Sequence, residues 1–496
     1  MKPTGGRASQ VPTSPGAQEL TTEQVPSRCL ITRCVRIYRR KPSCQREGFT
    51  PSISRSCTRL HPAMASTPSQ KSMTRHCSLQ IPFRMGYTTR ELKPSSECVP
   101  ESSPLMTSQI DTIKPFELHI DSRDLEDLRT RLRMTRYPEA ATRPGNSAPI
   151  DRWEQGPPLE EVRALVSHWA TDYSWRACEE HLNQVGQFKT VIDGVGIHFL
   201  HRRSPRPDAT PLLITHGWPG SVIEFAHLVD DLAEPIDTEA PAFHVVIPSL
   251  PGFGFSDKPE NTGWGTEKIA SAWVELMDRL GYPRFLAQGG DWGGVITTIL
   301  AGRFPDHVIG IHSTFNEGPV GQTKSGLTST DLEWVVHTQR FQKNHTAYAK
   351  VQADQPQTMG YSLVDSPVGL LTWILDKFFE WTDTKKSPFE SIQRDAFLDN
   401  VSMYWFSATG ASAARIYYES FGSLDPELTV DVPAAITTYP HDIAKTPRPW
   451  AQRRYRNIVH WQTPLSGGHF PSLEMPQYFL GDVRKGLAIV LNAARQ

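Results

Sequence analysis

Short apolar segments alternate with helical segments along the second half of the chain, and this alternation restricts the fold more than any other feature. Parallel strands cannot be joined by a tight turn, so they need a crossover, which is usually a helix. The alternation therefore predicts an α/β fold with a mostly parallel sheet covered by helices. The runs expected to be strands are residues 211–215, 243–250, 285–288, 307–315, 434–439 and 458–462.

The segment before this alternation shows helical periodicity and one hairpin signal. Apolar residues recur at helical spacing from Leu125 to Leu132 and from Leu159 to Trp169, which predicts two amphipathic helices. Residues 190–201 place an Asp-Gly pair between two apolar runs, a pattern typical of a β-hairpin. We therefore expect two helices and a hairpin ahead of the parallel strands.

About 120 residues separate the fourth expected strand from the fifth. They are rich in Trp, Tyr and Phe, have helical texture and contain no strand-like run. An insertion at this point predicts a helical cap over the carboxyl edge of the sheet, where α/β folds place their functional sites.

The first 112 residues differ in composition from the rest. They hold 41 Ser, Thr or Pro, no Trp, and 16 Lys or Arg against 7 Asp or Glu, whereas the other 384 residues hold 36 against 46. So polar a segment, without apolar periodicity, cannot bury enough surface to fold. We predict that residues 1–112 are a disordered extension, or the product of a gene prediction that starts too early, with Met64 or Met106 as the true start.

Charge and cysteine usage limit the partners and the compartment. With a formal charge of −1, the chain has no overall positive charge to attract nucleic acid. The sequence contains no run of about 18 apolar residues, so we expect no integral membrane segment. Six of the seven cysteines lie in the extension at spacings that match no metal site, which leaves only Cys178 beyond it. A fold without an internal disulfide fits a reducing compartment, so we expect the cytoplasm, with organelle targeting by the basic extension as the alternative.

The sharpest motif is the segment GGDWGG at residues 289–294, between an expected strand and an expected helix. Small residues around a central polar one are typical of a nucleophile elbow, where a strained turn pushes the central side chain outward. Here that residue is Asp291, a carboxylate that can attack carbon by displacement without a base. The alternative is that Asp291 only caps the following helix.

The segment HGWPGS at residues 216–221 follows the first expected parallel strand. In a hydrolase with such an elbow, the loop after this strand supplies one backbone N–H of the oxyanion hole, and the residue after the nucleophile supplies the other. The proposed donors are therefore the main chains of Trp218 and Trp292. An ordinary Gly/Pro turn with a packed Trp is the alternative.

A third signal is the segment GGHF at residues 467–470, with Asp442 upstream. Nucleophile, acid and His in this chain order are typical of α/β-hydrolases. Asp442 would hold His469 in one tautomer while His469 takes a proton from water.

These motifs give the chain a resemblance to a known family. From about Ile113 to the end it resembles the microsomal-type epoxide hydrolase family, including its soluble fungal members, through residues 216–221, 289–294, 365–374, 404–405 and 467–470. The resemblance implies an α/β-hydrolase fold with an N-terminal wrapping segment at 113–200, the hydrolase core at 201–318 and 431–496, and the helical cap at 319–430.

The resemblance also implies roles for single residues. Asp291 would be the nucleophile, His469 the base and Asp442 the acid that orients the base. Two cap tyrosines, Tyr348 and Tyr417, would be the acids, although the adjacent Tyr418 competes for the second role. Two phenols suit an epoxide, because its opening develops an alkoxide that an O–H group can stabilise and protonate.

The sequence therefore predicts an enzyme that needs no cofactor and no metal and adds water to a small apolar epoxide to give a vicinal diol. A haloalkane dehalogenase-like hydrolase is the nearest rival, and a catalytically silent ligand-binding member of the fold is the second. A serine esterase is disfavoured because the elbow holds Asp. The oligomeric state, a homodimer included, is left open by the sequence.

Overall fold

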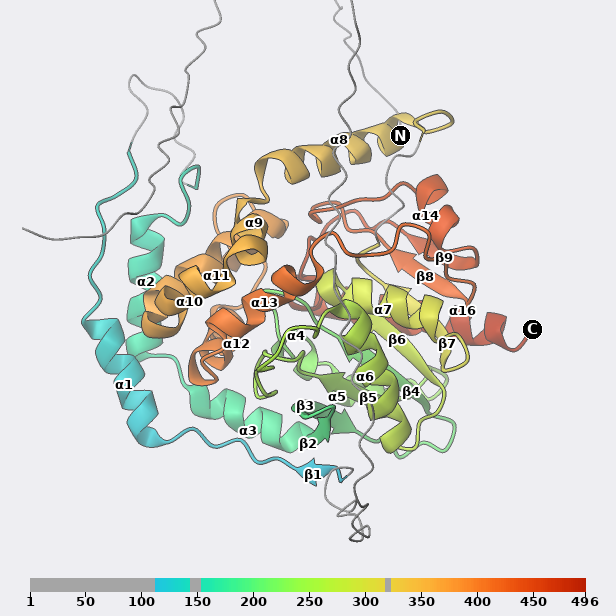
Figure 1. The fold of residues 1–496 in the computed structure, drawn as a ribbon, viewed down its shortest axis with the longest axis horizontal. Coiled ribbons are helices and arrows are strands. Elements are labelled where there is room, and N and C mark those ends of the chain that lie inside the picture. The colour runs from blue at the N-terminus through green and yellow to red at the C-terminus, as the bar shows by residue number, and fades with distance from the viewer. Residues whose placement is uncertain (1–111, 143–152, 317–322) are drawn as a thin grey trace, which may run out of the picture. The chain divides into compact units, whose positions relative to one another are not determined.

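The computed structural model describes residues 112–142, 153–316 and 323–496 (Figure 1). Nearly all of the predicted extension at residues 1–112, with its six cysteines and both alternative start sites, lies outside the described residues. Within the described ranges, no helix is both long enough and apolar enough to cross a membrane.

A nine-stranded sheet forms the centre of the described chain (Figure 1), in the order β1-β2-β3-β5-β4-β6-β7-β8-β9. The first three strands pair antiparallel, β3 pairs antiparallel with β5, and the remaining neighbours are parallel. This arrangement confirms the predicted mostly parallel sheet. The strands are β1 Lys114–Pro115, β2 Gln187–Ile192, β3 Val195–Arg202, β4 Thr210–Thr215, β5 Phe243–Pro248, β6 Phe285–Gly289, β7 Val308–Ser313, β8 Ala434–Thr437 and β9 Ile458–Gln462.

The strand order reverses around β4, which has β5 on one side and β6 on the other. The chain runs from β4 to β5 and then returns across β4 to start β6. Thr215 and Gly289, the last residues of β4 and β6, are paired in register. The loops that leave these two strands therefore begin side by side, at the kind of crevice where open α/β sheets bind ligands.

The hairpin between β2 and β3 confirms the signal read at residues 190–201. Ile192 pairs with Val195, and the two residues between them, Asp193 and Gly194, have φ values of 47° and 80°. Two consecutive positive φ angles match a type I′ turn, the turn whose twist suits a two-residue hairpin.

Three helices precede this hairpin, where the sequence predicted two. The predicted helices are α1 Ser122–Arg133 and α2 Leu159–Thr171, and an unpredicted third is α3 Trp175–Val185. Helix α3 buries Trp175, Cys178, Leu182 and Val185 on one face. It starts only a few residues after α2 ends, so the two helical patterns merge in the sequence.

The segment around α2 is attached to helix α12, Arg394–Phe406. Trp169 Nε1 donates to Ser402 Oγ at 3.0 Å, and Tyr173 O–H donates to an Asp399 carboxylate oxygen at 2.6 Å. His168 Nε2 lies 2.6 Å from Asp395 Oδ1. The N-terminal segment therefore lies against the helices inserted between β7 and β8, as Figure 1 shows for α1, α2, α10 and α11.

The described chain between β7 and β8 is helical, and this insertion is here called the cap. Its elements are α8 Ser329–Asn344, α9 Ala347–Asp354, α10 Pro356–Asp365, α11 Pro367–Trp381, the 3₁₀ turn η1 Pro388–Glu390, α12 and α13 Gly410–Ser420. The other helices flank the sheet or its loops and are α4 Ile223–Ala226, α5 Val229–Ala233, α6 Thr266–Arg279, α7 Asp291–Arg303, α14 Arg448–Arg454, α15 Pro471–Glu474 and α16 Pro476–Ala494.

Candidate active site

Asp291 lies at a sharp turn between β6 and α7. It is the first residue of α7 and has a φ of 49°, a left-handed conformation that costs roughly 1–2 kcal/mol for an L-residue. A Cβ atom on Gly293 would lie 1.8 Å from the carbonyl oxygen of Thr215, so only glycine lets α7 approach the end of β4 this closely. The strained turn and the close helix approach are both features of a nucleophile elbow.

The loop after β4 reaches the carboxylate of Asp291. The backbone N–H of Trp218 donates to Asp291 Oδ1 at 2.8 Å. Trp292 is the second residue of α7, where a backbone N–H has no carbonyl partner within the helix. One oxygen of the carboxylate is therefore held by the loop, and a second main-chain donor follows it in the chain.

The other carboxylate oxygen faces His469. His469 Nε2 lies 3.2 Å from Asp291 Oδ2, and His469 Nδ1 lies 2.6 Å from Asp442 Oδ1. The side chains of His469 and Asp442 are 2% and 3% exposed. The backbone N–H of His469 donates to the carbonyl of Trp381 at the end of α11. The structure thus brings together three residues that are far apart in the sequence.

The electrostatics of His469 depend on these two carboxylates. Burial alone would lower its pKa, but the negative charge of Asp442, the hydrogen bonds to Asp291 and Asp442 and the charge of Asp291 outweigh burial and raise the pKa to about 10. The imidazole is therefore protonated at neutral pH.

The two cap tyrosines lie next to each other above the tryptophans. Tyr348 on α9 and Tyr417 on α13 are 7% and 3% exposed, with ring centroids 5.8 Å apart. Tyr348 stacks on Trp218 at 5.3 Å, and Tyr417 meets Trp292 edge to face at 4.9 Å. The neighbouring Tyr418 is 55% exposed, so Tyr417 is the member of this pair that faces the site.

Burial keeps both inward phenols in the form that donates a proton. It raises the pKa of Tyr348 and of Tyr417 well above the ordinary value, and the negative charge of Asp291 raises both further. Both phenols are therefore neutral O–H groups near Asp291.

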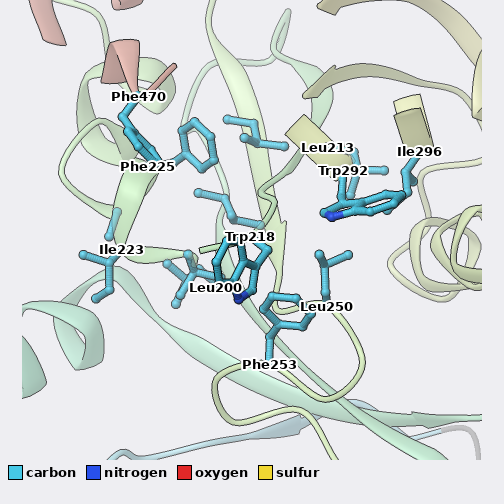
Figure 2. Packing of buried hydrophobic residues seen from close by; sticks show 14 of the residues in the cluster. Leu200, Leu213, Trp218, Ile223, Phe225, Leu250, Phe253, Trp292, Ile296 and Phe470 are labelled. Atoms are coloured by element: carbon cyan, nitrogen blue, oxygen red, sulfur yellow. The ribbon is translucent and has the colours of Figure 1, made fainter. Parts of the chain in front are cut away.

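The surroundings of these groups are apolar. Figure 2 shows Trp218 and Trp292 among the buried hydrophobic residues, together with Phe225, Phe253 and Phe470. Trp381 adds another ring, with its centroid 5.3 Å from Tyr348 and 5.0 Å from His469. Within the described ranges, no three His, Cys, Asp or Glu side chains are grouped as they would be around a metal ion.

Two buried polar residues next to the site were not predicted from the sequence. Glu224 on α4 is 8% exposed and Gln288 on β6 is 1% exposed. Both line the same small cavity as Asp291 and His469. The signal for Gln288 is a polar residue in an apolar strand immediately before the elbow, and for Glu224 it is a carboxylate in the apolar stretch after residues 216–221.

Comparisons with known proteins identify the family and the fold. Residues 113–225 match the family described as "Epoxide hydrolase N terminus", and residues 210–389 match "alpha/beta hydrolase fold". A Stigmatella aurantiaca protein that carries an epoxide hydrolase name is 42% identical over 377 residues, which are 75% of this chain and 84% of the relative. The chain belongs to the epoxide hydrolase family.

Further relatives place this epoxide hydrolase in the microsomal-type branch. Epoxide hydrolase 1 of Sus scrofa is 30% identical over 77% of this chain and 89% of its own length. The solved structure of Aspergillus niger epoxide hydrolase is similar with a TM-score of 0.68, at 30% identity over 77% of this chain and 98% of that chain. The predicted family and the predicted α/β-hydrolase fold are both confirmed.

Proposed function

We propose that this epoxide hydrolase converts a small apolar epoxide and water to a vicinal diol through a covalent ester on Asp291. The observation that carries the proposal is the unequal environment of the two carboxylate oxygens. Oδ1 accepts the Trp218 N–H, whereas Oδ2 faces His469. Oδ1 therefore occupies the proposed oxyanion site, and Oδ2 is the oxygen that can attack an epoxide carbon.

In the first step, Asp291 Oδ2 forms a bond to an epoxide carbon and the bond from that carbon to the ring oxygen breaks. The ring oxygen develops negative charge under Tyr348 and Tyr417. Hydrogen bonds from both phenols stabilise that charge, and one phenol gives up its proton to it. Because both phenols have raised pKa values, each holds its proton until the alkoxide appears.

In the second step, water loses a proton to His469 Nε2 while its oxygen forms a bond to the ester carbonyl carbon of Asp291. The Trp218 and Trp292 amides would stabilise the resulting oxyanion. Collapse breaks the bond from that carbon to Oδ2, and His469 returns its proton to the departing diol oxygen. The carboxyl group then ionises, and its proton restores the phenol.

The first step also prepares the base for the second. Ester formation removes the negative charge of Asp291, one of the causes that raise the pKa of His469. Its loss lowers the pKa of His469, so the imidazolium releases its proton to solvent and the neutral ring can accept a proton from water. The ring takes a proton back from solvent when the Asp291 charge returns. Asp442 remains at 2.6 Å to orient the ring and stabilise the imidazolium that forms.

The aromatic side chains around the carboxylate favour an apolar substrate of modest size. Trp218, Trp292, Trp381 and the two tyrosines are all buried around the carboxylate. Paired O–H donors suit an alkoxide, whereas the weakly basic halide of the rival dehalogenase reaction needs no proton.

Two measurements test the proposal. One is turnover of an aryl epoxide, an aliphatic epoxide and a haloalkane, with product identification; we expect diols and no halide release. The other is a single turnover in heavy-oxygen water, which should label the Asp291 carboxylate, because water attacks the ester and not the substrate carbon. Label confined to the diol would overturn the ester mechanism.

A further inference from the structure

A small cavity, lined by both polar and apolar side chains, adjoins the Asp291 carboxylate. Its volume is about 20 Å³, and its lining includes Asp291, His469, Glu224, Gln288, Thr314 and Ser472. A site needs about 10–15 Å³ and two to four polar partners to hold one water molecule. The cavity therefore has the size and the lining for a single water that touches both Asp291 and His469.

Gln288 supplies the first independent sign of a bound water. Its side chain is buried, yet neither its Oε1 nor its Nε2 has a hydrogen-bond partner in the described chain. The buried hydroxyl of Ser472, on the same cavity, also has no described partner. Buried polar atoms are seldom left unpaired, so such atoms around one cavity point to a polar molecule inside it.

Glu224 supplies the second sign, because its carboxyl group lies buried beside the cavity. Its Oε1 lies 1.4 Å from the position that a Cβ atom on Gly220 would occupy, so a larger residue at position 220 would displace the carboxyl group. Tyr404 and Asn400 of α12 donate to the carbonyls of Gly220 and Pro219, each at 2.8 Å. The loop that leads into α4 and Glu224 is thus hydrogen-bonded to the cap.

The charge state of Glu224 is linked to the reacting groups. Burial raises its pKa to about 8, with the charge of His469 acting in the opposite direction and that of Asp291 raising it further. None of the steps described above uses this buried acid. The Glu224 side chain lines the same cavity as Asp291 and His469, so a water in that cavity lies among all three side chains.

We propose that this cavity holds the hydrolytic water, and that Glu224 and Gln288 position it between His469 and the carbonyl carbon of the Asp291 ester. One O–H of the water would point to His469 Nε2 and the other to Glu224, while the Gln288 amide donates to a lone pair. The second lone pair is then free to form the bond to the ester carbon. Glu224 and Gln288 are positioning residues in this account.

This inference rests on the proposed ester mechanism, and its test separates the two chemical steps. Rapid mixing with an excess of an aryl epoxide, followed by acid quenching and mass spectrometry of the peptide that carries Asp291, gives the rates of ester formation and ester loss. The variants are Glu224→Met, Glu224→Gln and Gln288→Met. Glu179→Met, which removes a buried glutamate on α3 away from the cavity, is the matched control.

We expect ester loss to slow roughly ten- to a hundredfold in Glu224→Met and Gln288→Met, while ester formation stays within about twofold, so that the adduct accumulates. Glu224→Gln keeps one acceptor oxygen and should recover part of the rate. Glu179→Met should change neither step. Equal slowing of both steps in the cavity variants, or wild-type ester loss in both Met variants, would overturn the inference.

His469→Gln serves as the reference that keeps the two proposals apart. If the covalent ester accumulates in His469→Gln but not in the cavity variants, the role of Glu224 and Gln288 is rejected and the ester mechanism stands. The absence of adduct in His469→Gln and in the cavity variants would reject the ester mechanism itself. If Glu224→Met fails to fold, Gln288→Met still tests the inference, because Gln288 lies on β6 and Glu224 on α4.

Discussion

His469 Nε2 lies 3.2 Å from Asp291 Oδ2, and this contact joins the group proposed to attack carbon to the group proposed to activate water. In the resting enzyme the two groups form an ion pair. In the proposed mechanism the substrate carbon replaces the imidazolium as the partner of Oδ2, and the resulting ester would no longer carry the charge that raises the pKa of His469.

The two chemical steps should separate in variants of these residues. His469→Gln should still form the ester but not hydrolyse it, because Asp291 needs no base to attack. Mass spectrometry after mixing with an epoxide should show one added substrate mass on the peptide that carries Asp291. Asp291→Asn is the control and should show none. Rapid turnover without adduct in His469→Gln would contradict the assignment.

The pKa of His469 should fall when the charge of Asp291 is removed. In wild-type protein the pKa is raised to about 10, and Asp291 contributes both a hydrogen bond and a charge to that increase. In Asp291→Asn both favourable interactions with the imidazolium are weakened, so the ring should lose its proton at lower pH. Titration of the imidazole signals by NMR measures this directly. An unchanged pKa would show that Asp442 alone sets the protonation state.

The cap tyrosines should act on ester formation. Tyr348→Phe and Tyr417→Phe should each slow this step roughly a hundredfold without altering the fold, and the double variant should nearly abolish it. Single-turnover rates with circular dichroism check both statements. Tyr418→Phe is the matched control, because Tyr418 is 55% exposed. If Tyr418→Phe slows ester formation strongly and Tyr417→Phe does not, then Tyr418 and not Tyr417 is the second proton donor.

Truncation should distinguish the polar extension from the helices that follow it. A chain that starts near Ser108 should keep wild-type activity and melting temperature, because so polar a segment has little apolar surface to bury. A chain that starts after Leu132 loses α1 with its buried Leu128 and Leu132, each worth roughly 1.5–3 kcal/mol. Thermal unfolding of both chains tests this, and loss of folding in the first would contradict it.

The strands of the hydrolase core could be predicted because each is a short apolar run. Most are buried within the sheet, and the edge strand β9 is half-buried. Helix α3 was missed because its pattern follows that of α2 after only a few residues. The sequence could not choose between Tyr417 and Tyr418, since consecutive helical residues point about 100° apart and only the packing of α13 decides which faces inward. Glu224 and Gln288 lay within apolar stretches, and only the folded chain places them beside one cavity.

The attachment of α2 to α12 also bears on how substrates reach the carboxylate. The cap is connected to the core through its two chain ends and through hydrogen bonds such as those of Asn400 and Tyr404. The contacts of His168, Trp169 and Tyr173 attach the cap to the N-terminal segment as well. A cap restrained in this way cannot swing open as a hinged lid without breaking those contacts. Directed evolution toward bulkier epoxides should therefore include the residues that join α2 to α12, which lie outside the aromatic side chains around the carboxylate and restrain the cap.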